Sequence, residues 1–358
     1  MKNKIITISF VVIIEFFFLL SIIVKDEDIS RTERRHLKQF PEFTFAQFID
    51  GNFVDEFEEY SLDQFPFRDS FRSLKANFNY HVFNQLDNND IYLNEDGIFK
   101  IEYPTDTKSI DEFVIKINNI ISHLNENNHV YTMIVPDKNY YVDDKVFLKL
   151  DYDLLYAKMD ELNSENIDIR DLMNIDDYYQ TDPHWRQEKL DKVVKRMSEV
   201  MDFPYIKIDY QQNIYPDFYG AYYGQAALKR NPESLVYLTH DIFDQSVVTY
   251  LENPQLHQVY NVDKLQTMDA YEVFLDGASS FITIQNENSN TDKELVVFRD
   301  SFGSSFVPLL IPYYSRITVI DIRYITSDYY LDKVDFINQD VLFLYSTLLV
   351  NNSYSLKK

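Results

Sequence analysis

An apolar run at the N-terminus constrains the chain more than any other feature. The run covers 5–24 and contains one charged residue, Glu15. About 20 apolar residues are enough for an α-helix to cross a bilayer. Two lysines precede the run and KDED follows it, so the positive-inside rule keeps the N-terminus in the cytoplasm and exports the remainder. Because no small-residue cleavage site follows, we predict that residues 1–25 are an uncleaved anchor in a bacterial cell membrane rather than a removed signal peptide.

The composition excludes several classes of function. The 358 residues include no cysteine, which rules out disulfides, thiolate nucleophiles and cysteine-ligated zinc. The formal net charge of −24 is spread along the chain, and no lysine- or arginine-rich run occurs after residue 40. A nucleic-acid partner is therefore excluded. An exported domain also has no ready supply of ATP, and we predict neither a cofactor nor a metal ion.

Helical and strand-like patterns alternate along most of the chain. Residues 26–90 form a polar stretch with scattered aromatic residues, which we interpret as a helical stalk that leads into a main domain over 91–358. That domain opens with a hairpin predicted to turn at Asp96-Gly97. Amphipathic helices over 109–128 and 186–201 then alternate with short apolar strands, namely 129–135, 294–298, 316–322 and 340–346. This order predicts an α/β fold with a mainly parallel sheet flanked by helices, and the strand-rich stretch 206–290 is a possible β insertion.

The segment FRDSFGSSF, residues 298–306, lies where a strand passes into a helix. One reading is a helix N-cap, in which Asp300 or Ser301 accepts hydrogen bonds from free backbone N–H groups. The other reading is a serine nucleophile exposed at the carboxyl end of a parallel strand, where functional residues gather in such sheets. The segment by itself leaves both readings open.

A serine nucleophile needs a base, usually an imidazole that is oriented by a carboxylate. Among seven histidines, His184 stands out because TDPHW places Asp182 two residues before it and the only tryptophan, Trp185, directly after it. We predict that Trp185 packs against the imidazole and fixes it. The alternative is an N-cap aspartate beside an incidental histidine.

Together, TDPHW and RDSFGSSF resemble the DHHW family, bacterial relatives of the alginate O-acetyltransferases within the SGNH hydrolase superfamily. The pieces DIYLNEDGIF, MIVPDKNYY and ITVIDIRY agree in order, so the resemblance covers most of 30–346. It implies an SGNH-hydrolase-like fold in which Ser301 is the nucleophile, His184 the general base and Asp182 its orienting acid. Two residues depart from the pattern: Arg299 replaces a glycine before the Asp-Ser pair, and Pro183 replaces the first histidine of the name motif.

Four further residues are candidates for the site. An acyl-transfer site needs donors for the developing oxyanion, and we consider the backbone of Ser301 together with Gly220 or Gly224. The alternative for both glycines is ordinary turn geometry. Arg323 either binds a substrate carboxylate or steadies the site, and the alternative is a structural ion pair with Asp321. Lys138, at another strand end, is a candidate for the same roles.

The residues and the resemblance together predict a membrane-anchored serine O-acetyltransferase that modifies an extracytoplasmic polysaccharide. The resemblance further implies that a membrane-bound O-acyltransferase supplies the acetyl groups. Two alternatives stay open. One is a carbohydrate esterase that uses the same three residues with water as acceptor, and the other is a non-catalytic glycan-binding surface protein.

Overall fold

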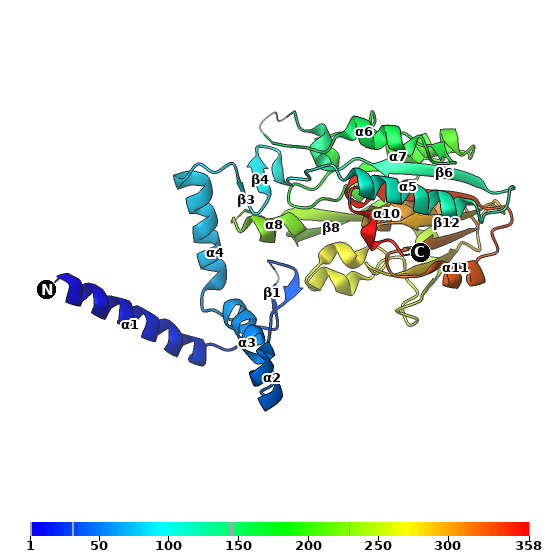
Figure 1. Cartoon of the computed structure of the whole chain (residues 1–358). Helices are drawn as coiled ribbons and strands as arrows, with labels where there is room; N and C mark the ends of the chain where they lie inside the picture. The colour runs from blue at the N-terminus through cyan, green and yellow to red at the C-terminus, as the bar shows by residue number, and fades with distance from the viewer. Residues whose placement is uncertain (1, 31, 144–146, 229, 358) are drawn as a thin grey trace. The chain divides into compact units, whose positions relative to one another are not determined.

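The computed structural model describes residues 2–30, 32–143, 147–228 and 230–357. By its internal contacts the chain divides into two compact units. The N-terminal unit contains Met1–Asn89 together with Tyr223–Asn231, and the main unit contains Asp90–Tyr222 together with Pro232–Lys358. Each unit is described by itself below (Figure 1).

The N-terminal unit begins with a long apolar helix. Helix α1, Lys2–Ile23, has 22 residues, none of them buried, and it is long and apolar enough to cross a membrane. The expected spanning helix is therefore present as a helix. Among the described residues, it is the one that meets this test of length and composition.

Short strands and three further helices follow α1 in this unit. Strands β1 (Ile29–Ser30) and β2 (Arg35–His36) pair antiparallel. The helices are α2 (Phe45–Asp50), α3 (Asn52–Asp63) and α4 (Arg68–Asn77), and α4 continues into a π-helical turn, Phe78–Val82; β3 (Asp87–Asn88) follows.

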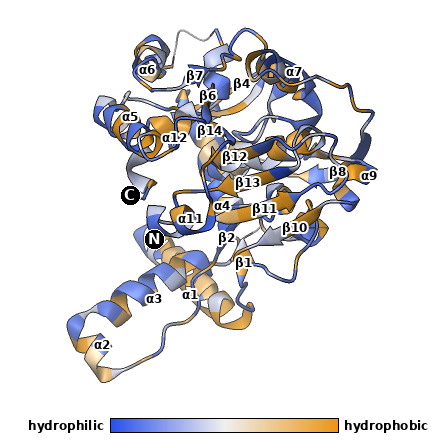
Figure 2. Ribbon diagram, turned by 90° about the vertical axis from the view of Figure 1, so that its right-hand side faces the viewer, coloured by the Kyte–Doolittle hydropathy of each residue, from blue (hydrophilic) through white to orange (hydrophobic). Residues whose placement is uncertain are grey.

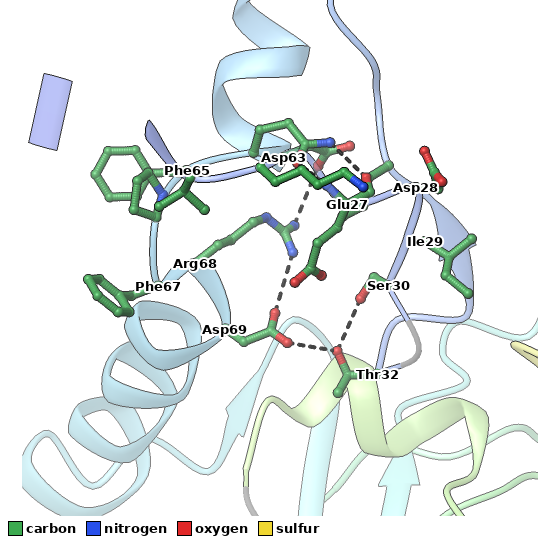
Figure 3. Close-up of a pocket in the computed structure, with 15 residues that line it drawn as sticks. Glu27, Asp28, Ile29, Ser30, Thr32, Asp63, Phe65, Phe67, Arg68 and Asp69 are labelled. Atoms are coloured by element: carbon green, nitrogen blue, oxygen red, sulfur yellow. Dashed lines mark hydrogen bonds and ion pairs between the residues drawn. The ribbon is translucent and has the colours of Figure 1, made fainter. Parts of the chain in front are cut away.

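A network of ion pairs joins β2, α3, α4 and the loop between β1 and β2. Glu33 accepts from Arg68 at 2.7 Å and from Arg72 at 2.9 Å, while both terminal nitrogens of Arg35 donate to Asp63. Figure 3 shows Arg68 between Asp63 and Asp69, each 3.8 Å from its guanidinium. The hydrogen bond from Arg35 lowers the pKa of Asp63 to about 2. The network thus joins these elements to one another.

The main unit is built on a seven-stranded sheet, with strand order β10-β11-β13-β12-β14-β6-β7. The strands are β6 (His129–Val135), β7 (Glu165–Asn166), β10 (Val247–Tyr250), β11 (Phe281–Gln285), β12 (Glu294–Arg299), β13 (Arg316–Ile320) and β14 (Asp340–Ser346). The five strands from β13 to β7 are parallel, and β11 and β10 extend the sheet antiparallel at one edge. The predicted mainly parallel α/β fold is confirmed.

Strand residues alternate between two cores, one on each face of the sheet. In β12, Leu295 and Val297 face one core and Val296 and Phe298 face the other, as the two-residue period of a strand requires. Figure 2 shows this apolar character along β11, β12 and β13. Helices α5 (Thr107–Ile121), α6 (Tyr152–Met159), α11 (Ser327–Lys333) and α12 (Thr347–Val350) contribute to the second core; α7 (Asp191–Val200), α9 (Asp241–Asp244) and α10 (Ser301–Phe306) contribute to the first.

Two local predictions need correction. The hairpin of β4 (Ile91–Asn94) and β5 (Gly97–Lys100) is present, but its register pairs Asn94 with Gly97, so the loop is Glu95-Asp96 and not Asp96-Gly97. The stretch 206–290 is not one β insertion. Strands β8 (Gln211–Phe218) and β9 (Glu233–Thr239) form a separate antiparallel pair, whereas β10 and β11 belong to the main sheet because their alternating apolar residues complete its cores.

We predict that Asp63→Asn destabilises the N-terminal unit at neutral pH by about 1–2 kcal/mol, since solvent around Arg35 screens part of the ion pair. The folded pKa of Asp63 lies below its ordinary value of 3.8, so its contribution is present above about pH 4 and is lost as the pH falls towards 2. Thermal unfolding of the full chain in detergent at pH 7 and pH 3 measures both effects. Glu58→Gln on exposed α3 is the control, and equal loss in both variants would contradict the account.

Candidate active site

The FRDSFGSSF segment forms the end of β12, the turn after it and helix α10. Strand β12 ends at Arg299, Asp300 is the N-cap and α10 begins at Ser301. One carboxylate oxygen of Asp300 accepts from the Phe302 N–H at 3.0 Å, and the other accepts from the backbone N–H and the hydroxyl of Ser346 at 2.8 and 2.7 Å. Asp300 therefore satisfies the cap, and the hydroxyl of Ser301 is available for another partner.

That partner is His184. Its Nε2 lies 2.8 Å from the hydroxyl oxygen of Ser301, and its Nδ1 lies 2.5 Å from a carboxylate oxygen of Asp182. Asp182 is fully buried, while His184 and Ser301 are partly exposed to solvent. The structure thus brings together the three residues predicted from the sequence, in the order that a serine nucleophile with an imidazole base requires.

Asp182 is held by more than the imidazole. It also accepts hydrogen bonds from the backbone N–H of His184 at 3.1 Å and of Ala221 at 2.8 Å. These contacts fix the carboxylate so that it faces one edge of the imidazole, and Nε2 on the other edge is directed at Ser301.

The side chain of Lys138 supports the loop that carries Asp182, and it is buried rather than open to a substrate. Its side chain is buried, and its ammonium donates to the carbonyl oxygens of Tyr179, Gln180 and Asp182 at 3.0, 3.0 and 3.2 Å. Three carbonyl acceptors in the same loop engage the ammonium, so Lys138 positions the Asp182 segment. Of the two roles predicted for Lys138, these contacts agree with the one that steadies the site.

The oxyanion role predicted for Gly220 is wrong. Its N–H donates to the hydroxyl of Thr181 at 2.9 Å, and a β-carbon at this position would lie 2.1 Å from the Thr181 carbonyl oxygen. Gly220 is needed because the chain passes very close to the segment that carries Asp182. The N–H of Ser301, as the first helical residue, has no acceptor within α10 and is the remaining predicted donor.

Gly224 has a different structural use. It belongs to the N-terminal unit, where a β-carbon would lie 1.7 Å from the carbonyl oxygen of Thr32. Its own carbonyl oxygen accepts from Arg72 at 2.8 Å. Close packing within that unit explains this glycine, and the prediction of an oxyanion role is corrected accordingly.

Trp185 packs against α10, the helix that begins at Ser301, and not against the imidazole. Its indole N–H donates to the Phe302 carbonyl oxygen and the Ser305 hydroxyl, each at 3.0 Å, and its ring contacts Phe302 and Phe306. The ring stacked on His184 is Tyr271, with centroids 3.9 Å apart and planes 10° apart. The sequence contains 28 tyrosines and Tyr271 stands in no motif, so no signal singled it out.

Arg323 forms the structural ion pair that was the alternative to substrate binding. It donates to both carboxylate oxygens of Asp321 at 2.9 and 2.6 Å. The fully buried Arg299 reaches the same carboxylate at 3.4 Å, and burial lowers the pKa of Arg299. A β-carbon at Gly303 would lie 2.7 Å from the side chain of Arg299, so the glycine in α10 makes room for this buried arginine.

At the level of sequence, neither a family profile nor a curated protein matches the chain. Solved structures do match. A DHHW family protein from Eubacterium siraeum is 21% identical, with a TM-score of 0.62 over 76% of this chain and 98% of that one. Bacillus cereus PatB1 with a sulfonyl adduct is 21% identical, with a TM-score of 0.60 over 74% and 97%.

The similar structures also include the O-acetyltransferase domain of Pseudomonas putida AlgJ, at 10% identity and a TM-score of 0.42 over 73% of this chain and 92% of that domain. At 21% identity the likeness to the DHHW family protein and to PatB1 shows a shared fold. The three candidate residues all lie in the main unit of this chain.

We predict that Lys138→Met destabilises the main unit by about 3 kcal/mol, because buried carbonyl groups lose a charged donor. Loosening the Asp182 segment should also slow any reaction that depends on His184. Thermal unfolding measures the first effect. Lys108→Met on the exposed side of α5 is the matched control and should change stability by about 0.5 kcal/mol or less. Equal stability of the two variants would show that Lys138 does not support the loop.

Proposed function

We propose that the protein is a serine O-acyltransferase that moves acetyl groups to a polysaccharide outside the cell membrane. The observation that carries the proposal is the 2.8 Å contact between His184 and Ser301, which lie 117 positions apart in the chain. An N-cap serine would need no imidazole on its hydroxyl. The fold, shared with a DHHW family protein, and the AlgJ O-acetyltransferase domain among the similar structures agree with this kind of function.

In the first half-reaction the hydroxyl oxygen of Ser301 attacks the carbonyl carbon of an acetyl ester. Its proton passes to Nε2 of His184, while Asp182 stabilises the imidazolium through Nδ1. The N–H of Ser301 faces the developing oxyanion. The bond to the donor oxygen then breaks, and His184 returns the proton to that oxygen. An acetyl ester of Ser301 remains.

In the second half-reaction a sugar hydroxyl of the acceptor attacks the acetyl-serine. It gives its proton to His184, and the proton then passes to the oxygen of Ser301 as that ester bond breaks. Dividing the transfer in this way requires no nucleotide, which suits a site outside the membrane. In this proposal a membrane-bound O-acyltransferase supplies the acetyl groups, and α1 anchors the chain in the membrane.

One cavity of the main unit has side chains of the kinds that contact sugars. It has a volume of about 510 Å³ and is lined by Tyr237, Phe243 and Tyr260, with Asn213, Thr239, His257 and the acidic Asp244 beside them. Aromatic rings and neutral polar groups are the side chains that a sugar ring contacts through its faces and hydroxyls. The esterase alternative uses the same three residues with water in place of the sugar, whereas a glycan-binding protein would not need all three.

We predict that a sulfonyl fluoride labels Ser301, as a sulfonyl adduct is found in PatB1. Ser301→Ala should abolish labelling, and His184→Ala and Asp182→Asn should slow it by about 10³-fold or more, because the hydroxyl loses its base or the base loses its orientation. Peptide mass spectrometry identifies the labelled residue. Ser304→Ala in the same helix is the control and should keep wild-type labelling. If His184→Ala were labelled at the wild-type rate, His184 would not be the base.

We predict that a polysaccharide acceptor diverts the acetyl group from water. With a chromogenic acetyl ester as donor, the ratio of acetylated glycan to free acetate should rise with the acceptor concentration, since both compete for one acetyl-serine. Chromatography of both products measures the ratio. If acetate alone forms at every concentration of every glycan tried, the esterase reading replaces the transferase.

A further inference from the structure

The loop between α3 and α4 presents two phenylalanines in an unusual way. Phe67 is 63% exposed, and its backbone is left-handed, with φ 61°. A bulky residue rarely adopts a positive φ, because its β-carbon crowds the backbone. Figure 3 shows the rings of Phe65 and Phe67 directed away from the charged side chains of Asp63, Arg68 and Asp69. Loop strain and exposed aromatic rings thus coincide at one place.

The same loop lies against the apolar helix α1. The ring of Phe17 stacks on Phe65 with centroids 5.3 Å apart and contacts Phe71 at 5.7 Å. Phe17 lies seven residues before Val24, which is about 10 Å along a helix. If α1 crosses the bilayer, Phe65 and Phe71 lie about 10 Å below the outer end of α1, within the apolar part of the outer leaflet.

An open apolar cavity continues this surface. A volume of about 770 Å³ is lined by Ile13, Phe17 and Phe18 of α1 and by Phe40, Phe57 and Phe65. The opposite side of the loop is ionic, because Arg68 pairs with Glu33 and Arg35 with Asp63. Apolar and ionic surfaces separate on the two sides of one loop, as they do in segments that lie in a membrane interface.

We propose that Phe65, Phe67 and Phe71 form an aromatic wedge that inserts into the outer leaflet beside α1, with lipid acyl chains as its occupant. The proposal rests on the membrane anchor of the proposed function and does not depend on the acyl chemistry. Transfer of the rings into lipid offsets the cost of the left-handed Phe67, and the ion-pair network keeps the polar side of the loop in water. The wedge gives the N-terminal unit a second membrane contact.

A tryptophan placed at the wedge tests this directly. The native Trp185 is fully buried, so lipid quenchers act on the emission of the added tryptophan. Full-length Phe67→Trp, reconstituted in phosphatidylcholine vesicles, should lose its added emission when the lipid is brominated about 10 Å from the headgroup end of its acyl chains, the depth of Phe17. Phe83→Trp is the matched control, since Phe83 is 65% exposed and lies sixteen residues further, about 24 Å along a helix. Its emission should persist.

Each outcome decides the proposal. Vesicle flotation reports the anchor, so a chain that floats while Phe67→Trp stays unquenched overturns the wedge alone and indicates that a protein partner covers this face. A chain that does not float overturns the anchor and the wedge together. Equal quenching at 67 and 83 overturns a specific wedge. If Phe67→Trp alters the melting curve, Phe71→Trp on the next turn takes its place with the same expectation.

Discussion

The carboxylate of Asp300 holds the turn on which the whole site depends. One oxygen caps α10 through the Phe302 N–H, and the other joins the turn to the end of β14 through Ser346. Because both oxygens are used in this way, the helix begins at Ser301 at the carboxyl end of a parallel strand, and the serine hydroxyl is left for His184. The two readings of the segment therefore fall on adjacent residues: Asp300 is the helix cap, and the proposed nucleophile is Ser301.

The histidine comes from a loop without regular structure, and polar contacts on two sides give that loop its shape. Lys138 donates to its carbonyl groups from one side, and Glu233 accepts from the N–H groups of Gln180 and Thr181 on another. Ser305 joins the loop to α10, since its hydroxyl contacts both the Trp185 indole and the Tyr271 phenol. These contacts hold His184 in place, which the proposed role as base requires.

The sequence predicted what depends on pattern and missed what depends on tertiary contact. The period of strand and helix located β6, β12 and β14, and two short motifs located Asp182, His184 and Ser301. The contacts of Lys138 and Gly220 were not predicted, because their partners, the Tyr179–Asp182 carbonyls and Thr181, lie forty residues or so away in sequence. Tyr271 was missed for the same reason: stacking on an imidazole leaves no local trace in the chain.

The central claim is that Ser301 carries the acetyl group between donor and acceptor. The most direct measurement is to mix the full chain with a chromogenic acetyl ester, stop the reaction in acid within one turnover, and map the peptides by mass spectrometry. The account predicts an acetyl group on the peptide that contains Ser301, which disappears when a glycan acceptor is added before the acid. Turnover of the ester with no acetyl group on Ser301, or with the group on another residue, would contradict it.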